Sequence, residues 1–211
     1  MVDTEQRATL FKAARTRQQL AESLGYNYKF FEFFLFAKDV ELHYTEFNIA
    51  KTYKGERVIA APNERLKQIQ KNLADILLLI FKPKKCVHAF VKDKNIVTNA
   101  RPHLKARNIL RLDLKDFFPS IHFGRVRNLF EAEPFNFPRE VSTIIAKICC
   151  YKKSLPQGAP SSPIISNMIC LRMDAQLTRL SRDNSCKYTR YADDITFSTN
   201  CSEFPPKILS S

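Results

Sequence analysis

The chain has 211 residues, 45% of them hydrophobic and 26% charged, a balance that excludes disordered and fibrous proteins and suits one large globular domain or two small subdomains. Lys and Arg total 34 against 21 Asp and Glu, and the formal charge of +13 is typical of proteins that contact phosphate backbones, although charge alone does not identify a nucleic-acid surface. The four glycines, at positions 25, 55, 124 and 158, form neither a GxGxxG nor a GxxxxGK loop, which excludes Rossmann and P-loop phosphate sites.

The six cysteines show no CxxC pair and no histidine at zinc-ligand spacing, so a zinc site is not expected. Cys149, Cys150 and Cys170 lie in apolar stretches, which favours buried free thiols in a reducing cytosol. Residues 1–20 are charged and polar and lack the apolar run of a secretion signal or membrane span. We therefore expect a cytoplasmic protein that does not bind membranes.

An N-terminal helix is expected first along the chain, followed by an aromatic segment. Apolar residues recur at helical spacing over residues 5–24, and Gly25 follows as a candidate C-cap. Residues 26–36 are crowded with tyrosine and phenylalanine, which either pack in a core or stack on bases; core packing is the favoured interpretation.

A hairpin and a second helix are predicted next. Residues 48–61 place Ile49, Tyr53, Val58 and Ile59 around Lys54-Gly55-Glu56, a hairpin pattern with basic residues on its flanks. Asn63 then caps a helix whose apolar face extends from Leu66 to Ile80. Residues 124–133 and 138–151 are predicted to be helical as well.

The strand predicted over residues 108–114 has two different faces. Leu110, Leu112 and Leu114 share one face, and if they point to the core, Asp113 points outward into a cleft. Further on, Ser162 is a candidate N-cap, followed by one apolar helix face as far as Leu180.

Two adjacent carboxylates form the most informative pattern. The runs 186–191 and 195–199 are strand-like, and Ala192-Asp193-Asp194 between them predicts a tight hairpin. Like charges a few ångströms apart repel unless a cation lies between them. A third carboxylate, Asp113, would let two Mg²⁺ ions bind about 3.5–4 Å apart. An isolated Asp-Asp pair, by contrast, is more often a solvated turn.

Three ordered motifs carry a resemblance to a known family. They are Leu112-Asp113-Leu114-Lys115-Asp116-Phe117-Phe118, Leu155-Pro156-Gln157-Gly158-Ala159-Pro160-Ser161-Ser162-Pro163 and Tyr191-Ala192-Asp193-Asp194. Together they resemble the reverse transcriptases over about residues 45–200. Asn99-Ala100-Arg101-Pro102-His103 resembles the NAxxH motif of the retron branch. Without that resemblance, Asn99 would be a loop cap and His103 an ordinary polar histidine.

The resemblance implies an α+β fold made of the fingers and palm of a right-hand polymerase, with an antiparallel palm sheet packed on helices. We expect an N-terminal helical and aromatic segment over residues 1–45, fingers over 46–107, and a palm over 108–211 with inserted fingers helices at about 124–155. The thumb is expected to be absent, because the chain ends at Ser211, soon after the hairpin. A fragment, a partner chain that supplies the thumb, or a truncated form would each account for this.

Family roles transfer to matching positions. Asp113 and Asp193 would be catalytic ligands of both metal ions, and Asp194 would support them. Among nucleotide-binding residues, Phe118 would exclude a 2′-hydroxyl, Gln157 would contact the incoming nucleotide, with the turn at Gly158 letting backbone approach it, and Arg57 would clamp the triphosphate. Lys51 and Lys54 are weaker candidates. Asn99 and His103 would contact RNA, and Arg190 would support the hairpin backbone or the template.

The function implied is that of an RNA-directed DNA polymerase of a retron. Such an enzyme uses two Mg²⁺ ions (Mn²⁺ is possible) and dNTPs to copy a structured non-coding RNA into branched, RNA-linked DNA (msDNA), primed from a guanosine 2′-hydroxyl, in defence against phage. An effector protein is a possible partner. The alternatives are a reverse transcriptase of a group II intron or another defence system, and a truncated RNA-binding subunit without activity.

Overall fold

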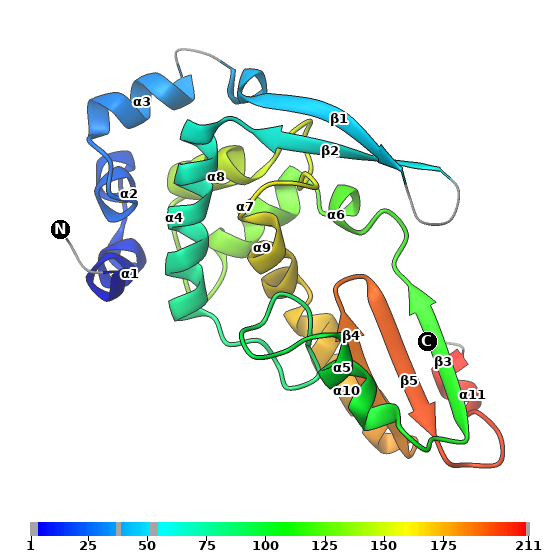
Figure 1. Cartoon of the computed structure of the whole chain (residues 1–211). Coiled ribbons are helices and arrows are strands. Elements are labelled where there is room, and N and C mark those ends of the chain that lie inside the picture. Colours follow the sequence, from blue (N-terminus) through cyan, green and yellow to red (C-terminus); the bar gives the residue numbers. More distant parts are fainter. Residues whose placement is uncertain (1–3, 37–38, 51–54, 210–211) are drawn as a thin grey trace. The chain divides into compact units, whose positions relative to one another are not determined.

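The computed structural model of the chain describes residues 4–36, 39–50 and 55–209 (Figure 1). The chain folds into two compact units, each made of two stretches of sequence. The first unit comprises residues 1–82 and 118–165, and the second comprises residues 83–117 and 166–211. Both combine helices with antiparallel strands, as the expected α+β class requires. No helix in the described residues is long and apolar enough to cross a bilayer.

The N-terminal part of the first unit contains α1 (Thr4–Ala13), α2 (Arg17–Ser23) and α3 (Tyr28–Phe36). The helical structure expected over residues 5–24 is present but divided into two helices, because Thr16 caps the start of a new one. Its side chain accepts a hydrogen bond from the backbone of Gln19, whose own side chain accepts one from the backbone of Thr16. The expected break after the second helix is confirmed, since Gly25 has a φ of +84°.

The aromatic stretch contributes to the core of this unit. Phe31 and Phe34 of α3 are buried, whereas Phe33 is 68% exposed. Elsewhere in the unit, Phe11 contacts the rings of Phe135 and Phe137 edge to face. Core packing therefore accounts for part of the aromatic content, and the exposed rings of α3 leave base stacking as a prediction.

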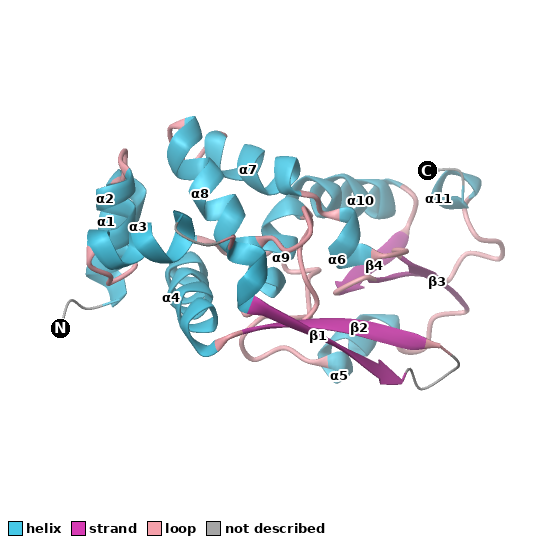
Figure 2. Ribbon diagram, turned by 90° about the horizontal axis from the view of Figure 1, so that it is seen from above, coloured by secondary structure: helices cyan, strands magenta, loops and turns pink. Residues whose placement is uncertain are grey.

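The predicted hairpin and capped helix are confirmed. After η1 (Val40–His43), β1 (Tyr44–Ala50) pairs antiparallel with β2 (Glu56–Pro62) to form a two-stranded ribbon (Figure 2). The side chain of Asn63 accepts a hydrogen bond from the Leu66 amide at 3.0 Å and so caps α4 (Glu64–Ile80). The inward face of α4 is buried as predicted. Further along the chain, α6 (Phe117–Ser120) contains the boundary of the two units, and α7 (Phe123–Glu131) and α8 (Arg139–Cys149) belong to the first.

The second unit is built on a three-stranded antiparallel sheet in the order β3-β5-β4. Its strands are β3 (Asn108–Asp113), β4 (Cys186–Tyr191) and β5 (Asp194–Thr199). The helical elements are α5 (Ile96–Ala100), η2 (Arg101–His103), α10 (Leu171–Asp183) and α11 (Pro206–Leu209), while α9 (Ser162–Ile169) contains the boundary of the two units. The helix expected to run unbroken from Ser162 to Leu180 is interrupted at Cys170. Ser162 is itself the first residue of α9, and its hydroxyl donates to the Pro156 carbonyl at 2.7 Å.

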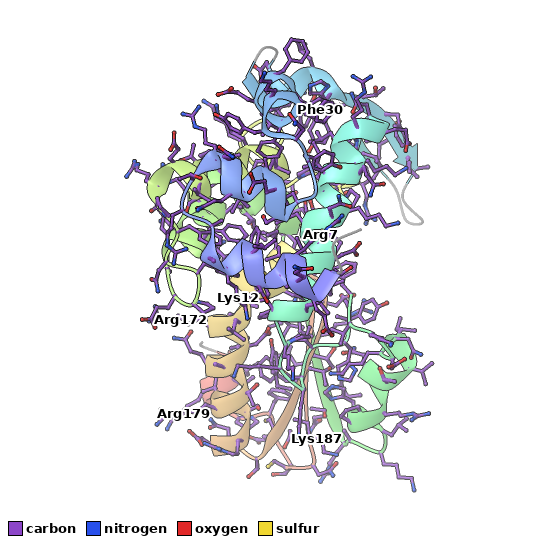
Figure 3. The ribbon with its side chains drawn as sticks, turned by 90° about the vertical axis from the view of Figure 1, so that its left-hand side faces the viewer. Arg7, Lys12, Phe30, Arg172, Arg179 and Lys187 are labelled. Carbon is purple, nitrogen blue, oxygen red and sulfur yellow. The ribbon has the colours of Figure 1, made fainter. Side chains whose placement is uncertain are left out.

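One face of this sheet forms the core of the second unit. Tyr188, Ile195 and Phe197 are buried there, and apolar residues of α10 pack against them. Figure 3 shows Arg172 and Arg179 of α10 projecting from the same side of that helix, whereas Asp174 of α10 is buried. Leu110 and Leu114 join the cluster as predicted, but Leu112 is 43% exposed. Leu112 therefore departs from the predicted leucine face, although β3, an edge strand of the described sheet, carries Leu110 on that face as well.

Candidate active site

The predicted tight hairpin joins β4 and β5 through Ala192 and Asp193, and Tyr191 pairs with Asp194 across it. Ala192 has a φ of +57°, the conformation that a type II′ turn requires at its first central residue. Asp113 is the partner of Asp194 in the β3–β5 register. The Leu114 amide also donates to the Asp193 carbonyl at 3.1 Å. Backbone pairing therefore brings all three predicted catalytic aspartates to one end of the sheet.

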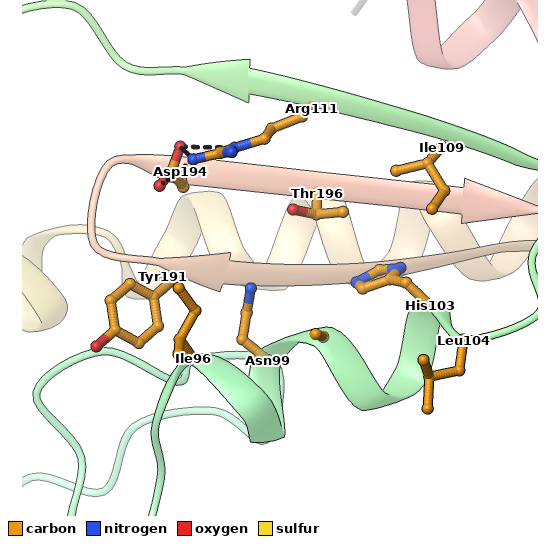
Figure 4. Close-up of a pocket in the computed structure, with 10 residues that line it drawn as sticks. Ile96, Asn99, His103, Leu104, Ile109, Arg111, Tyr191, Asp194 and Thr196 are labelled. Carbon is orange, nitrogen blue, oxygen red and sulfur yellow. Dashed lines mark hydrogen bonds and ion pairs between the residues drawn. The ribbon is translucent and has the colours of Figure 1, made fainter. Parts of the chain in front are cut away.

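A guanidinium lies beside these carboxylates. Arg111 of β3 donates to Asp194 through Nε at 3.0 Å and through Nη2 to both carboxylate oxygens at 2.8 and 2.9 Å. Figure 4 shows the two side chains facing each other on the sheet. This contact was not predicted, although the spacing of Arg111 and Asp113 places both on one strand face and could have suggested it.

Carboxylate oxygens are donors that hard divalent cations prefer, so the chemistry of this cluster fits such ions. Within the described ranges, however, no three acidic, histidine or cysteine side chains are arranged as a ready ligand set. The ion pair with Arg111 turns the Asp194 carboxylate toward β3. Metal binding by the three aspartates therefore stays a prediction.

A groove of about 310 Å³ adjoins the hairpin on the sheet face that carries Arg111 and Asp194. Ile96, Leu104 and Ile109 give it apolar walls, and Asn99 rises from α5 toward the sheet (Figure 4). The Asn99 side chain is buried, and its Oδ1 has no hydrogen-bond partner among the residues that the structure describes.

His103 also lines the groove but is tied to the sheet. Its Nδ1 lies 2.6 Å from the Ser198 hydroxyl and its Nε2 lies 2.8 Å from the Thr189 hydroxyl. Burial lowers the pKa of His103 below its usual value, and the positive charge of Lys187 lowers it further. The neutral His103 ring is therefore hydrogen-bonded through both nitrogens, to Thr189 of β4 and to Ser198 of β5. Direct RNA contact by His103 stays a prediction.

The predicted nucleotide-binding residues belong to the first unit. Arg57 is exposed on β2, and Phe118 is partly buried in α6. The Gln157 carbonyl accepts a hydrogen bond from the Ala60 amide at 2.8 Å, which fastens the turn at Gly158 to β2. Buried Gln157 Oε1 has no hydrogen-bond partner within the described part of the chain. Lys51 and Lys54 lie outside the described residues.

The backbone at Gly158 makes a close approach, as expected, but its neighbour is β2. A Cβ on Gly158 would lie 2.8 Å from the Ala60 carbonyl oxygen. The expected approach to a bound substrate stays a prediction.

Residues 49–206 match the family model described as reverse transcriptase (RNA-dependent DNA polymerase). The chain belongs to the reverse transcriptase family. The β4–β5 hairpin, the β3 aspartate and the turn at Gly158 all lie inside the matched residues.

Similar proteins identify the branch of the reverse transcriptase family. The chain is 35% identical over 204 residues to the retron Mx65 reverse transcriptase of Myxococcus xanthus, covering 87% of this chain and 47% of the relative. It is 40% identical over 145 residues to the retron Ec86 reverse transcriptase of Escherichia coli, covering 69% and 45% respectively. These similarities support the predicted retron type. The chain spans about half the length of the curated relatives it matches.

Proposed function

We propose that this chain carries the polymerase centre of a retron reverse transcriptase, an RNA-directed DNA polymerase that acts in the cytoplasm. The observation that carries the proposal is the sheet register. It places Asp113 opposite Asp194, and the Leu114 amide donates a hydrogen bond to the Asp193 carbonyl. Three carboxylates from two chain segments at one hairpin end suit nucleotidyl transfer. The proposal keeps the fingers at residues 46–107 and about 124–155 and the palm at the rest of 108–211.

Asp113 and Asp193 would hold two Mg²⁺ ions, or Mn²⁺ in their place, and Asp194 would support them. When bound, the ions would activate the attacking hydroxyl and stabilise the leaving pyrophosphate. Before they bind, Arg111 offsets the charge of Asp194 through its forked hydrogen bonds and so lowers repulsion within the cluster.

The first unit would bind the incoming dNTP. Arg57 is exposed and presents a planar guanidinium suited to a triphosphate. Gln157 would contact the nucleotide once its side chain turns outward, because its Oε1 is buried and lacks a hydrogen-bond partner among the described residues. Phe118 would pack against the deoxyribose and exclude a 2′-hydroxyl. Each role is separable, because Phe118 variants should alter the preference for dNTP over rNTP while Arg57 variants should raise KM for both.

The substrate would be a structured non-coding RNA that serves as template and primer, with branched RNA-linked DNA (msDNA) as product. The retron relatives and the NAxxH motif support this choice. Asn99, at the groove beside the hairpin, would contact that RNA. The biological role would be defence against phage together with an effector protein.

DNA synthesis by the purified protein with its RNA, Mg²⁺ and dNTPs tests the proposal. Asp113→Asn and Asp193→Asn should each lower the rate by at least about 100-fold, because each removes a ligand charge worth several kcal/mol at the transition state. Asp183→Asn is the matched control, since Asp183 is an exposed aspartate of α10 that pairs with Arg179. It should retain wild-type activity.

Three results would contradict the proposal. They are a wild-type protein that makes no DNA, an Asp193→Asn variant as active as wild type, and an Asp183→Asn control as impaired as the other variants. A protein that binds the RNA but shows no Mg²⁺-dependent affinity for dNTP in calorimetry would instead be an RNA-binding subunit. Loss of phage protection in cells that carry Asp193→Asn would link synthesis to defence.

A further inference from the structure

Arg190, two residues before the catalytic turn, is completely buried. Its Nε and Nη2 donate to the two carboxylate oxygens of Asp174 on α10, both at 2.8 Å. Nη2 also lies 3.2 Å from the Asn167 amide oxygen on α9. Tyr188 donates its hydroxyl to the same aspartate at 2.8 Å. The guanidinium is therefore held in one orientation from the side of the sheet that faces α10.

The remaining arm of this guanidinium reaches the turn itself. Nη1 of Arg190 donates to the Ala192 carbonyl at 2.9 Å. That carbonyl and the Asp193 amide belong to one planar peptide unit, so fixing the carbonyl also fixes the plane from which Asp193 extends. The next peptide unit is held as well, because the Asp193 carbonyl accepts from the Leu114 amide at 3.1 Å. Both peptide units that flank Asp193 are anchored.

The backbone of Arg190 is anchored in the same way. Its amide donates to the Cys86 carbonyl at 2.8 Å, and its carbonyl accepts from the His88 amide at 2.9 Å. The turn is thus supported by Arg190, a β4 residue that is hydrogen-bonded through both its backbone and its side chain. All of these partners belong to the second unit.

A buried ion pair is a costly way to obtain stability alone. Desolvation of both charges offsets most of their attraction, and a well-packed apolar pair of similar volume often stabilises a protein equally well. An apolar side chain, however, has no donor for the Ala192 carbonyl. The contact that distinguishes arginine from an apolar residue at this position is therefore the contact with the catalytic turn.

We propose that Arg190 is a positioning residue that fixes the Ala192–Asp193 peptide and thereby aims the Asp193 carboxylate, while Asp174 and Asn167 hold its guanidinium in place. This inference rests on the proposed function, in which Asp193 is a metal ligand. It predicts that losing the contact disturbs the turn and the chemical step while the rest of the unit stays folded.

The test replaces both members of the buried ion pair so that no unpaired charge remains. The triple variant Arg190→Met, Asp174→Leu, Tyr188→Phe removes the ion pair and the hydroxyl that would otherwise lose its acceptor. Tyr188→Phe alone is the matched control, because it perturbs the same cluster but keeps the bond from Arg190 to Ala192. Thermal unfolding of both variants establishes that they are folded.

Three measurements then separate positioning from a purely structural role. In the triple variant, amide exchange over residues 191–195 should become faster while exchange in α10 stays near that of the control. Its kcat should fall by about 100-fold, as expected for a displaced catalytic group, with KM for dNTP nearly unchanged. The Mg²⁺ concentration for half-maximal activity should rise in the triple variant but not in Tyr188→Phe.

Amide exchange in the turn equal to that of the control, or a kcat equal to that of Tyr188→Phe, would overturn the inference. If the triple variant does not fold, Arg190→Lys serves instead, because lysine keeps the charge beside Asp174 without the forked reach to Ala192. Unchanged exchange in that variant overturns the inference too. A wild-type protein that makes no DNA refutes the proposed function, whereas amide exchange still decides whether Arg190 fixes the turn.

Discussion

Replacing Gly158 by alanine should destabilise the first unit sharply. Gly158 has a φ of +121°, a region that side chains with a Cβ rarely adopt. The new Cβ would lie 2.8 Å from the Ala60 carbonyl oxygen and 3.0 Å from Cγ2 of Ile59. To relieve these contacts, the turn must move away from β2 and lengthen the 2.8 Å hydrogen bond between the Gln157 carbonyl and the Ala60 amide.

Backbone strain of about 1–3 kcal/mol and a lost hydrogen bond of about 1 kcal/mol together lower the free energy of unfolding by about 2–4 kcal/mol. For a chain of this size, the melting temperature should fall by about 5–15 °C in thermal unfolding followed by circular dichroism. Gly124→Ala is the control, since Gly124 lies in α7 and its Cβ would meet only the His122 ring, at 3.4 Å. It should raise stability by up to about 1 kcal/mol.

A Gly158→Ala protein that melts within about 2 °C of wild type would show that the turn can move without cost, and would refute the reasoning. An equal loss in Gly124→Ala would show that glycine itself, rather than the close approach to β2, matters. Because Gln157 is adjacent, Gly158→Ala should also raise KM for dNTP if that residue contacts the nucleotide.

Two further predictions concern pH and thiol chemistry. Burial lowers the pKa of both His88 and His103, so the unfolded chain binds more protons than the folded chain below about pH 6.5. The free energy of unfolding should therefore hold above that pH and fall as the solution is acidified. Urea unfolding of His103→Gln should show a weaker pH dependence than that of wild type. Cys201 is exposed, whereas burial raises the pKa of Cys149 to about 12, so a thiol reagent should label Cys201 first in the native protein, and rapid labelling of Cys149 would contradict the described core.

Local signals in the sequence predicted much of the fold. The Asn63 cap, the apolar face of α4 and the β4–β5 hairpin each depend on residues that are close in sequence, and each is confirmed as a structural element. The break between α1 and α2 was also readable, because Thr16 and Gln19 stand at capping-box spacing. It was missed because the apolar periodicity runs across it.

Contacts between distant segments could not be predicted in this way. Arg190 and Asp174 are sixteen residues apart, and their ion pair depends on which face of α10 packs against β4. The approach of Gly158 to Ala60 likewise depends on how the turn meets β2. The family resemblance and the hairpin pattern predicted that the three aspartates lie close together. The ion pair between Arg111 and Asp194 could be assigned only once the register of β3 against β5 was known. The assignments of fingers and palm stay predictions.

The buried pair of Arg190 and Asp174 also restricts how this protein can evolve. Losing either partner alone leaves an uncompensated charge in the core, which costs about 3–5 kcal/mol, a large share of the roughly 5–15 kcal/mol that a typical domain has. A lineage can therefore leave the Arg-Asp combination only through two nearly simultaneous substitutions, or after gaining stability elsewhere. The two positions should be inherited together, and exchange between related genes that separates them should yield chains that fail to accumulate in the cell.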